Sequence, residues 1–501
     1  MSSDLVIVYH RQPYEEVEVD GKIELRENSS PNGIVPTLKS FFGRVSKASW
    51  VAWKYAEDPA NPEFERVIEI DDSYGKYNVS RLPLTPEQVT SFYHVSSKEA
   101  FWPILHGFKE RYNYDPVDWP MFRQVNWAFA EAAAAEASDD AVVWVHDYNL
   151  WLVPAYLRQL KPSVKIAFFH HTPFPNPDLF NVLPWREEIV RSLLEADAVG
   201  FHIPRYSNNF KAVARSLTSS RTIDEAPTIE EMSPRGMALS ERNTIKALRH
   251  HEHDIIVDTS PVGVDTDYIE SCMAEPEVQA KVEEIRADLG EQQLIVSVSR
   301  TDYTKGNVQQ LEAFERLLAK RPDLHGKVRL MHVSVGANRN MTAYEEIQQR
   351  IEELTGRING TYGSFEWQPV ALISTAIPFK ELLAYYRAAD VAWITPLADG
   401  LNLVASEFCM TRADLGGVLV LSEFAGVAVL LDGAVPVNPF SHASMDSGIE
   451  QALAMDAEEM RGRMERLRAR VRAFDINGWV GSQTALFDRL RRVDHAADDA
   501  A

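Results

Sequence analysis

The sequence is poor in cysteine: Cys272 and Cys409 are the only two among 501 residues. They lie too far apart to form a metal-binding or redox spacing such as C-x-x-C. A disulfide-built fold is thereby excluded, and two lone cysteines are typical of a reducing compartment. We therefore expect a cytoplasmic protein in which both thiols are small buried side chains.

Long apolar runs are also missing. No run approaches the roughly 18 to 20 residues that a membrane-spanning helix needs. The opening "MSSDLVIVYHRQP" turns polar after a short apolar stretch and lacks the basic start of a signal peptide. We expect no membrane association.

Positive charge is scarce, with 51 Lys and Arg against 73 Asp and Glu and a formal net charge of -22. Such a surface repels nucleic acid, so no nucleic-acid partner is expected. It is also compatible with raised salt, although many mesophilic enzymes share it. A hydrophobic content of 45 % is ordinary for a globular protein, and the length favours two domains.

Several well-known motifs are absent: G-x-G-x-x-G, the P-loop, H-E-x-x-H and the D-x-D-G-T phosphatase signature. Nucleotide hydrolysis and zinc peptidase chemistry therefore gain no support. Nothing in the sequence indicates a metal site.

Short apolar runs bounded by polar residues recur along the chain. They include LVIVYH, AVVWVHD, KIAFFHH and DAVGFH in the first half, and QLIVSVSR, KVRLMHVSV, DVAWITP and GVLVLSEF in the second. Amphipathic stretches such as NWAFAEAAAAEA and VQQLEAFERLLAK separate them. Apolar strands alternating with helices predict parallel sheets covered on both faces, hence two Rossmann-like, doubly wound α/β domains.

The polar segment 218–265, rich in Pro, Ser and Thr, predicts the break between the domains. We predict an N-terminal domain over residues 1–255 and a C-terminal domain over 256–470. Residues 471–501 are expected to form a helix that packs back on the first domain. Ligands of open parallel sheets bind beyond the carboxyl ends of the strands, so we expect the domains to face a central cleft there.

In "SVSRTDYTKG", Arg300 and Lys305 follow a strand and precede a helix. A guanidinium and an ammonium at this spacing can neutralise a diphosphate leaving group. The alternative is a solvated turn with a salt bridge from Arg300 to Asp302.

In "ITPLADGLNLVASEF", Asp399 is expected at the N-cap of a helix whose first amides, around Leu401 to Val404, bind sugar hydroxyls or phosphate. Glu407, two turns further on, can accept hydrogen bonds from a ribose diol. The alternative makes Asp399 only a cap and Glu407 a surface acid.

Asp147 in "WVHDYNLWLVP" and His171 in "FFHHTPFP" each follow a predicted strand. A carboxylate and an imidazole at neighbouring strand ends can hold sugar hydroxyls or act as acid and base. A purely structural role is the alternative for each. Gly33 in "SPNGIVPTLKSFF" precedes a helix and would allow backbone to approach a phosphate closely, although one glycine is a weak signal.

Six motifs carry a resemblance: HDYNLWLVP, FFHHTPFP, RTDYTKG, GRINGTYG, TPLADGLNLVASE and LSEFAG. In order and spacing they are similar to the trehalose-6-phosphate synthase family, retaining glycosyltransferases with the two-domain GT-B fold. The resemblance covers about residues 5 to 480 and implies that the N-terminal domain (1–255) binds the acceptor and the C-terminal domain (256–470) binds the nucleotide sugar. It implies transfer of glucose from a nucleotide-glucose to a phosphorylated acceptor, without a required metal, in which the leaving phosphate takes the acceptor's proton.

By this resemblance the donor-binding residues are Gly33, Arg300, Lys305, Asp399, Gly400, Leu401, Asn402, Leu403, Val404 and Glu407. The residues expected to take part in catalysis are Asp147, His171, Arg300 and Lys305.

Departures from the family pattern alter both the acceptor pocket and the pocket of the nucleotide base, where the family's helix arginine is absent around IPFKELLAYY. The chain has "YHR" in place of "SNR", "YHVSSKEAFWP" in place of "YNGFSN", Asn149 in place of a histidine, and Arg339 shifted by one position. These departures resemble one branch of the family, the glucosylglycerol-phosphate synthases, which join ADP-glucose to sn-glycerol 3-phosphate. The acceptor-binding residues expected from this are Arg11, Tyr93, Lys98, Trp102 and Asp147.

The branch implies a product, 2-O-(α-D-glucosyl)-sn-glycerol 3-phosphate, that is a precursor of the compatible solute glucosylglycerol in salt-stressed cells and passes to a separate phosphatase. The partners are then small molecules and the nucleotide sugar is a co-substrate, with no cofactor; a homo-oligomer is compatible with the sequence. The alternatives are a trehalose-6-phosphate synthase using glucose 6-phosphate and a catalytically silent sugar-phosphate sensor. Intact Arg300, Lys305, Asp399 and Glu407 disfavour the sensor.

Overall fold

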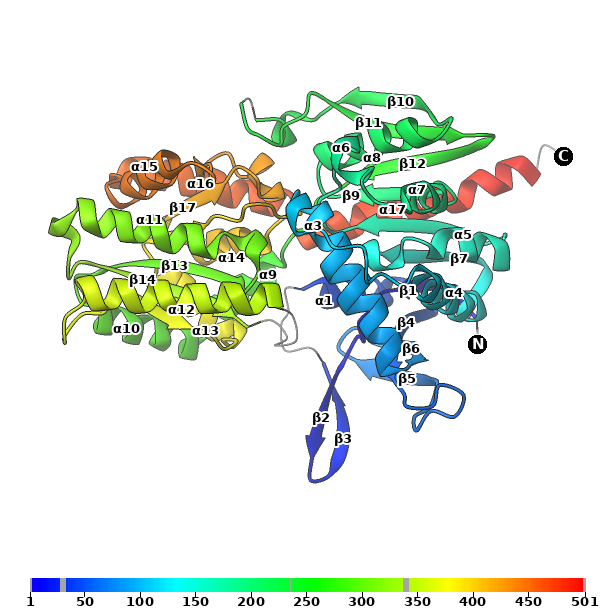
Figure 1. Cartoon of the computed structure of the whole chain (residues 1–501), viewed down its shortest axis with the longest axis horizontal. Coiled ribbons are helices and arrows are strands. Elements are labelled where there is room, and N and C mark those ends of the chain that lie inside the picture. The colour runs from blue at the N-terminus through cyan, green and yellow to red at the C-terminus, as the bar shows by residue number, and fades with distance from the viewer. Residues whose placement is uncertain (1, 28–32, 235, 337–341, 499–501) are drawn as a thin grey trace. The chain divides into compact units, whose positions relative to one another are not determined.

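The computed structural model describes residues 2–27, 33–234, 236–336 and 342–498, except for the side chains of 342–343 and 493–498. The chain divides into two compact units. Unit 1 comprises Met1–Thr228, Glu241–Pro261 and Trp479–Ala501, and unit 2 comprises Ile229–Ser240 and Val262–Gly478. Figure 1 follows the elements of each unit along the chain.

A ten-stranded sheet forms the centre of unit 1, in the order β10-β11-β12-β9-β8-β7-β1-β4-β6-β5. The strands are β1 (Ser3–Val8), β4 (Ala48–Tyr55), β5 (Val67–Asp72), β6 (Gly75–Leu84), β7 (Ala137–His146), β8 (Lys165–His170), β9 (Ala198–Phe201), β10 (Arg221–Pro227), β11 (Asn243–His250) and β12 (His253–Thr259). From β12 to β6 every neighbouring pair is parallel. The almost fully buried apolar runs of β1, β7, β8 and β9 explain this arrangement, because a parallel sheet is covered on both faces.

Antiparallel strands extend this sheet at both edges. β5 pairs with β6 at one edge, and β10 and β11 continue from β12 at the other. A separate hairpin joins β2 (Glu15–Val19) to β3 (Lys22–Arg26). The segment 218–265, which the sequence predicts as a polar break, therefore contributes three strands, because polar residues suit the exposed faces of an edge hairpin.

Helices and turns connect the strands of unit 1. They are α1 (Ile34–Lys39), η1 (Phe42–Arg44), α2 (Pro86–Val89), the π-helix η2 (Thr90–Phe101), α3 (Trp102–Leu105), η3 (Lys109–Arg111), α4 (Trp119–Glu136), η4 (Tyr148–Leu150), α5 (Val153–Leu160), α6 (Pro177–Phe180), α7 (Arg186–Leu193), α8 (Pro204–Leu217) and most of α17 (Ile476–Asp498). α4, α5, α7 and α8 contact one another in that order.

The terminal helix α17 packs on unit 1 through aromatic side chains. Trp479 stacks on Trp144 with ring centroids 5.4 Å apart, and Phe487 meets Trp144 edge-on at 5.0 Å. Gln483 donates a hydrogen bond to Asp258. Buried aromatic contacts of this kind fix the end of the chain to the sheet.

Unit 2 is built on a six-stranded, wholly parallel sheet in the order β15-β14-β13-β16-β17-β18. Its strands are β13 (Gln293–Arg300), β14 (Val328–Val335), β15 (Val370–Ile373), β16 (Val391–Ile394), β17 (Val418–Ser422) and β18 (Val435–Val437). The strand order reverses between β13 and β16. Ligands of doubly wound sheets bind beside such a reversal, at the carboxyl ends of the strands.

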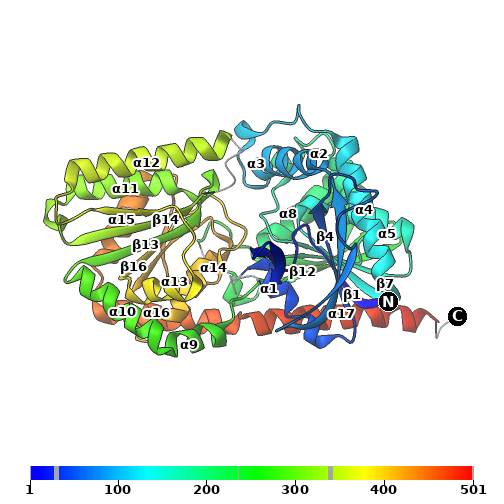
Figure 2. The same ribbon diagram turned by 90° about the horizontal axis from the view of Figure 1, so that it is seen from below.

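The helices and turns of unit 2 are η5 (Glu230–Met232), α9 (Thr266–Ala274), α10 (Pro276–Leu289), η6 (Tyr303–Lys305), α11 (Asn307–Lys320), η7 (Pro322–Leu324), α12 (Thr342–Tyr362), α13 (Phe379–Ala388), α14 (Leu403–Thr411), η8 (Gly426–Val429), α15 (His442–Leu453) and α16 (Ala457–Ala473). In Figure 2 the sheet lies between α11 and α12 on one side and α10 and α13 on the other. Trp393, Phe314 and Ile358 belong to the buried cluster between the sheet and its covering helices. The two doubly wound units are Rossmann-like, as the sequence predicts.

The sequence predicts a change of domain after residue 255 and a separate C-terminal helix from residue 471. The structure places these changes after Pro261 and at Trp479, and it assigns Ile229–Ser240 to unit 2. None of the helices in the described part of the chain is long and apolar enough to cross a membrane.

Candidate active site

The turn after β13 holds Arg300, Lys305 and the start of α11. Arg300 ends the strand with an exposed side chain, and its carbonyl oxygen accepts hydrogen bonds from Ser299 and Asn307. The Asp302 carboxylate accepts from the amide of Thr304 at 2.9 Å, which fixes η6. The guanidinium of Arg300 forms no ion pair with any residue that the structure describes, so the predicted alternative of a salt bridge to Asp302 is wrong.

Gly306 holds this turn against the loop after β16. Its φ of 70° lies in the left-handed region, and an added Cβ would stand 2.2 Å from the carbonyl oxygen of Thr395. The amide of Leu397 donates to the carbonyl of Thr304 at 2.7 Å. Only glycine satisfies both demands, and the contact places Lys305 beside the loop that carries Asp399.

Lys305 and Asp399 form an ion pair, with Nζ to Oδ2 at 2.7 Å and both side chains largely buried. The amide of Asp399 donates to the carbonyl of Phe424, and its own carbonyl accepts from Gly426. An ammonium has three N–H donors, so two remain for other acceptors when Asp399 takes one. The ion pair holds the Lys305 ammonium in place, and the Asp399 carboxylate partly neutralises its charge.

The prediction that Asp399 is the N-cap of the next helix is wrong. α14 begins at Leu403, and its cap is Asn402, whose side-chain oxygen accepts from the amide of Ala405 at 3.2 Å. Asn402 has a φ of 87°, a region that asparagine tolerates better than most residues. Asp399 instead accepts from the Asn402 side chain at 3.2 Å and binds Lys305.

Glu407 lies within α14 and is 5 % exposed, so the alternative of a surface acid is also wrong. Its carboxylate lies beside the phenol of Tyr386, where burial and then the charge of Glu407 raise the pKa of Tyr386. A carboxylate held in so little water is a strong hydrogen-bond acceptor for hydroxyl groups.

Arg11 and Tyr93 meet in unit 1. Arg11 follows β1, where its carbonyl accepts from the Trp50 indole, and its guanidinium lies 3.5 Å from the Tyr93 hydroxyl. Tyr93 belongs to η2, whose Ser96 and Ser97 hydroxyls each donate to the carbonyl five residues earlier. π-Helices are rare in proteins, and those that occur are often found at functional sites.

Lys98 lies over two aromatic rings. Its Nζ is 4.1 Å from the ring centroid of Trp102 and 5.6 Å from that of Tyr93. Trp102 is almost fully buried and its ring lies 6.0 Å from that of Tyr148. These cation–π contacts hold the ammonium in one place.

Asp147 follows β7 with a φ of 69°, and its Oδ1 accepts from the amide of His171 at 3.3 Å. Burial raises the pKa of Asp147 to about 6, against the opposing effects of backbone donors and of the charge of Lys98. The charge of Lys98 is therefore near enough to lower the pKa of this carboxyl. A carboxyl with this pKa can exchange a proton near neutral pH.

His171 follows β8, and its Nε2 lies 3.1 Å from Nδ1 of His146. Burial, and then the neighbouring histidines, hold the pKa of His171 well below its usual value, so the ring is neutral. Contacts in unit 1 link Arg11, Tyr93, Lys98 and Trp102, and a separate contact links Asp147 to His171, while the charge of Lys98 acts on Asp147. Unit 2 gathers Lys305 with the segment from Asp399 to Val404 in the same way.

The sequence also singled out Gly33, Asn149 and Arg339. Gly33 belongs to unit 1, at the start of α1, with an extended φ of -148° that any residue adopts. Among the described residues the nearest atom to its Cβ position is in the Pro36 side chain, at 3.7 Å, so none of them requires a glycine there. Asn149 is buried and its carbonyl accepts from Asn126. Arg339 lies outside the described residues.

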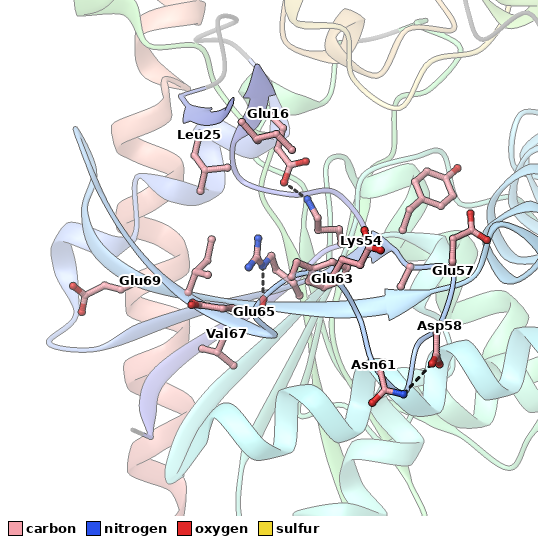
Figure 3. A pocket seen from close by; sticks show the side chains of 16 residues that line it. Glu16, Leu25, Lys54, Glu57, Asp58, Asn61, Glu63, Glu65, Val67 and Glu69 are labelled. Carbon is pink, nitrogen blue, oxygen red and sulfur yellow. Dashed lines mark hydrogen bonds and ion pairs between the residues drawn. The ribbon is translucent and has the colours of Figure 1, made fainter. Parts of the chain in front are cut away.

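A cavity of about 840 Å³ lies elsewhere in unit 1, between the β2–β3 hairpin and strands β4, β5 and β6. Figure 3 shows Lys54 paired with Glu16 at its wall. None of the residues predicted for the site lines it. Its carboxylates, which outnumber its cations and disfavour phosphate binding, are Glu16, Glu57, Asp58, Glu63, Glu65 and Glu69.

Within the described part of the chain, no group of three or more His, Cys, Asp or Glu side chains is placed to hold a metal ion.

The model of glycosyltransferase family 20 matches residues 3–489. The chain belongs to glycosyltransferase family 20. It is therefore a retaining glycosyltransferase, as the sequence motifs predict.

The most similar relatives that we compared belong to one branch of this family. A glucosylglycerol-phosphate synthase of Synechocystis is 50 % identical over 480 residues, which is 96 % of this chain and 96 % of that protein. A glucosylglycerol-phosphate synthase of Picosynechococcus is 47 % identical with the same coverage. A trehalose-6-phosphate synthase of Mycobacterium is 37 % identical over 95 % of this chain and 94 % of its own. The predicted similarity to the glucosylglycerol-phosphate synthase branch is confirmed.

Solved structures agree on the fold. The α,α-trehalose 6-phosphate synthase of Burkholderia multivorans is 29 % identical with a TM-score of 0.85, covering 100 % of this chain and 98 % of that chain. An E. coli structure bound with UDP-2-fluoro glucose is 26 % identical with a TM-score of 0.83, covering 97 % and 98 %. The predicted GT-B fold of this family 20 protein is confirmed.

Sequence reasoning missed two features of the site. The Lys305–Asp399 pair joins residues far apart in the chain, and no local pattern signals it. The contact of His146 with His171 had a signal, since each histidine stands at the end of a predicted strand, but it depends on β7 and β8 being neighbours.

Proposed function

We propose that this glycosyltransferase transfers glucose from ADP-glucose to sn-glycerol 3-phosphate and forms 2-O-(α-D-glucosyl)-sn-glycerol 3-phosphate. The observation that carries the proposal is the identity of 50 % and 47 %, over 96 % of the chain, to two proteins named glucosylglycerol-phosphate synthase. The trehalose-6-phosphate synthase relative at 37 % is more distant.

Unit 2 supplies the donor half of the proposed site. Arg300 is exposed and without an ion pair among the described residues, and Lys305 keeps N–H donors beyond the one on Asp399. We assign both to the diphosphate, whose charge grows as the sugar leaves. The segment from Asp399 to Val404 holds the glucose and phosphates, Glu407 accepts from the ribose hydroxyls, and we also assign Gly33 to phosphate binding. The E. coli relative bound with UDP-2-fluoro glucose supports a nucleotide sugar as donor class.

Unit 1 supplies the acceptor half. Arg11 and Lys98 are two cations linked through Tyr93, a fitting partner set for the doubly charged phosphate of glycerol 3-phosphate. Trp102 and Tyr93 hold the Lys98 ammonium in place. Asp147 and His171 lie beside this set and orient the hydroxyl groups of donor and acceptor.

The transfer balances without a protein nucleophile. The bond from glucose C1 to the diphosphate oxygen breaks, and C1 bonds to O2 of glycerol 3-phosphate on the same face. The proton of that hydroxyl passes to the leaving diphosphate, so ADP departs with the charge that Arg300 and Lys305 stabilise. The residues bind, orient and neutralise, and no metal or cofactor takes part in this account.

The structure of the product tests the reaction. The purified protein is incubated with ADP-glucose and sn-glycerol 3-phosphate, and the product is examined by NMR. We expect an α-glucosyl residue on O2. A β-anomer, linkage to O1, or hydrolysis of ADP-glucose without transfer would contradict the proposal.

A trehalose-6-phosphate synthase is the second candidate, because the chain is 37 % identical to one over 95 % of its length. Glucose 6-phosphate would then be the acceptor. A panel of ADP-, UDP- and GDP-glucose crossed with glycerol 3-phosphate, glucose 6-phosphate and 3-phosphoglycerate separates the candidates. Turnover with glucose 6-phosphate alone would favour this second function.

The setting of the reaction is also part of the proposal. We place the enzyme in the cytoplasm, where its two buried, unbridged cysteines stay reduced. The phosphate of the product calls for a separate phosphatase to release glucosylglycerol, a solute suited to osmotic or salt stress. A homo-oligomer remains open to measurement by light scattering.

A further inference from the structure

The fully buried His146 and the partly buried His171 form a pair in unit 1. They end the neighbouring parallel strands β7 and β8, and their rings stack with centroids 5.3 Å apart. Nδ1 of His146 lies 3.1 Å from Nε2 of His171, a hydrogen-bond distance. One ring must donate to the other.

Both rings are neutral, because burial lowers the pKa of His146 and of His171 well below the usual value. A neutral imidazole carries one N–H donor and one acceptor nitrogen. The contact therefore allows two arrangements, with the shared proton on His146 Nδ1 or on His171 Nε2. Each arrangement fixes the tautomer of both rings.

The surroundings of His146 choose between them. Its Nε2 is buried and has no hydrogen-bond partner among the described residues. The ring of Trp144 packs against the His146 ring with centroids 4.3 Å apart, and the ring of Tyr9 lies edge-on to it with centroids 6.4 Å apart. A buried N–H without a partner is rarer than a buried acceptor without one. Nε2 of His146 is therefore the bare nitrogen, and Nδ1 carries the proton.

We infer that His146 is a positioning residue whose Nδ1–H donates to His171 Nε2 and locks His171 in the tautomer protonated at Nδ1. This inference rests on the proposed function in one respect, namely that His171 orients substrate hydroxyls. Nδ1 of His171 makes no hydrogen bond to a described residue. It is then a ready N–H donor for a hydroxyl oxygen of the substrate.

The lock gives a role to a histidine whose side chain is fully buried. If the ring of His171 were free to exchange tautomers, half of its arrangements would offer a lone pair where a donor is needed. A fixed partner removes that loss, as second-shell partners do for metal-bound histidines.

Nitrogen NMR of the protein labelled with ¹⁵N-histidine tests the tautomer directly and needs no substrate. The signal set of His171 is assigned by its disappearance in His171→Gln. We expect Nδ1 of His171 at the position of a protonated ring nitrogen and Nε2 at that of a bare one. The reverse pattern would overturn the inference, and so would a pattern averaged between the two.

Three variants of His146 test its consequence. Asparagine places an amide N–H near the position of Nδ1, whereas glutamine places it near Nε2 and leucine removes the donor. We expect His146→Asn to keep kcat within about threefold, and His146→Gln and His146→Leu to lose about 10- to 100-fold in kcat with smaller changes in KM. Equal losses in all three would assign His146 to packing alone.

The two proposals fail in different ways. If the NMR pattern holds but glycerol 3-phosphate is no acceptor, the proposed function fails and the histidine pair stands. If glycerol 3-phosphate is the acceptor and the pattern is reversed, only the inference about His146 fails.

Discussion

Arg300 stands exposed at the end of β13 without an ion pair in the described part of the chain. We expect Arg300→Ala to lower kcat/KM for ADP-glucose by about 10²- to 10³-fold, the usual cost of removing one preorganised charge partner of a developing anion. The melting temperature should not change, because the side chain makes no contact that folding needs.

Arg357→Ala is the matched control for Arg300. Arg357 pairs with Glu315 on helices of the same unit, and its side chain is half exposed. It should leave kcat/KM unchanged and cost little stability, because solvent screens an exposed ion pair. A turnover of Arg300→Ala equal to that of Arg357→Ala would remove Arg300 from the donor site.

Asp147 has a pKa of about 6, raised by burial from the usual 3.8. Because the pKa is raised, the folded protein binds the Asp147 proton more tightly than the unfolded chain does. Its contribution to stability is therefore full below about pH 4 and is lost as pH rises through 6, by about 3 kcal/mol in total. Asp147→Asn carries no such pH-dependent loss.

We expect Asp147→Asn to be more stable than the native protein towards urea at pH 7.5, by at most about 3 kcal/mol, and inactive or nearly so. The gain should shrink as the pH falls from 7 towards 4. Asp140→Asn, at an exposed position of the same strand, is the control and should show no such trend. A gain that is constant with pH would mean that the carboxyl titrates normally.

The π-helix η2 carries Tyr93 and Lys98, and Arg11 and Trp102 complete the proposed acceptor side. Lys98→Met keeps the length of the side chain and removes the charge. We expect KM for glycerol 3-phosphate to rise about tenfold or more, since one charge-assisted bond to phosphate contributes about 1.5 to 3 kcal/mol. KM for ADP-glucose should change little.

Lys109→Met, at an exposed position shortly after the helix, controls for net charge. A second readout is the pKa of Asp147, which should rise in Lys98→Met because the lysine charge lowers it. If KM for ADP-glucose rises instead, Lys98 belongs to the donor.

Gly306 joins η6 to α11 and touches the loop after β16. We expect Gly306→Ala to destabilise unit 2 by clearly more than the roughly 1 kcal/mol of a left-handed φ alone, because its Cβ would also overlap the carbonyl of Thr395. Gly326→Ala is the control in the same unit, with φ 76° and no atom of a described residue within 4 Å of the Cβ position. Equal losses of melting temperature in both variants would mean that the close approach carries no energy.

Elements with a strong apolar pattern could be predicted from the sequence. LVIVYH, AVVWVHD and QLIVSVSR became β1, β7 and β13, because continuous burial on both faces leaves no other residue pattern. η2 could not be predicted, since its residues fit an ordinary helix and the wider turn is set by tertiary contacts such as those of the buried Phe92 and Phe101. Asp399 was mistaken for a cap because the left-handed Asn402 starts the helix three residues later.

Predictability of the site follows the same division. The position of Asp147 and His171 at strand ends could be inferred, because parallel strands end at one edge of a sheet. The burial of Glu407 could not, because a lone acid in an apolar helix is compatible with either face until the packing is known.

At the scale of the whole molecule, the alternation of strands and helices predicted two doubly wound units, and the family match over residues 3–489 agrees. The antiparallel additions β5, β10 and β11 were outside that prediction, since their polar edges resemble linkers. The central claim about the whole molecule is the identity of its acceptor.

The most direct test is the ratio of kcat/KM for sn-glycerol 3-phosphate to that for glucose 6-phosphate, with ADP-glucose as the common donor. We predict a ratio of about 100 or more, because a site built around one acceptor rejects another whose polar groups it leaves unpaired. A ratio below one would contradict the account and make the chain a trehalose-6-phosphate synthase.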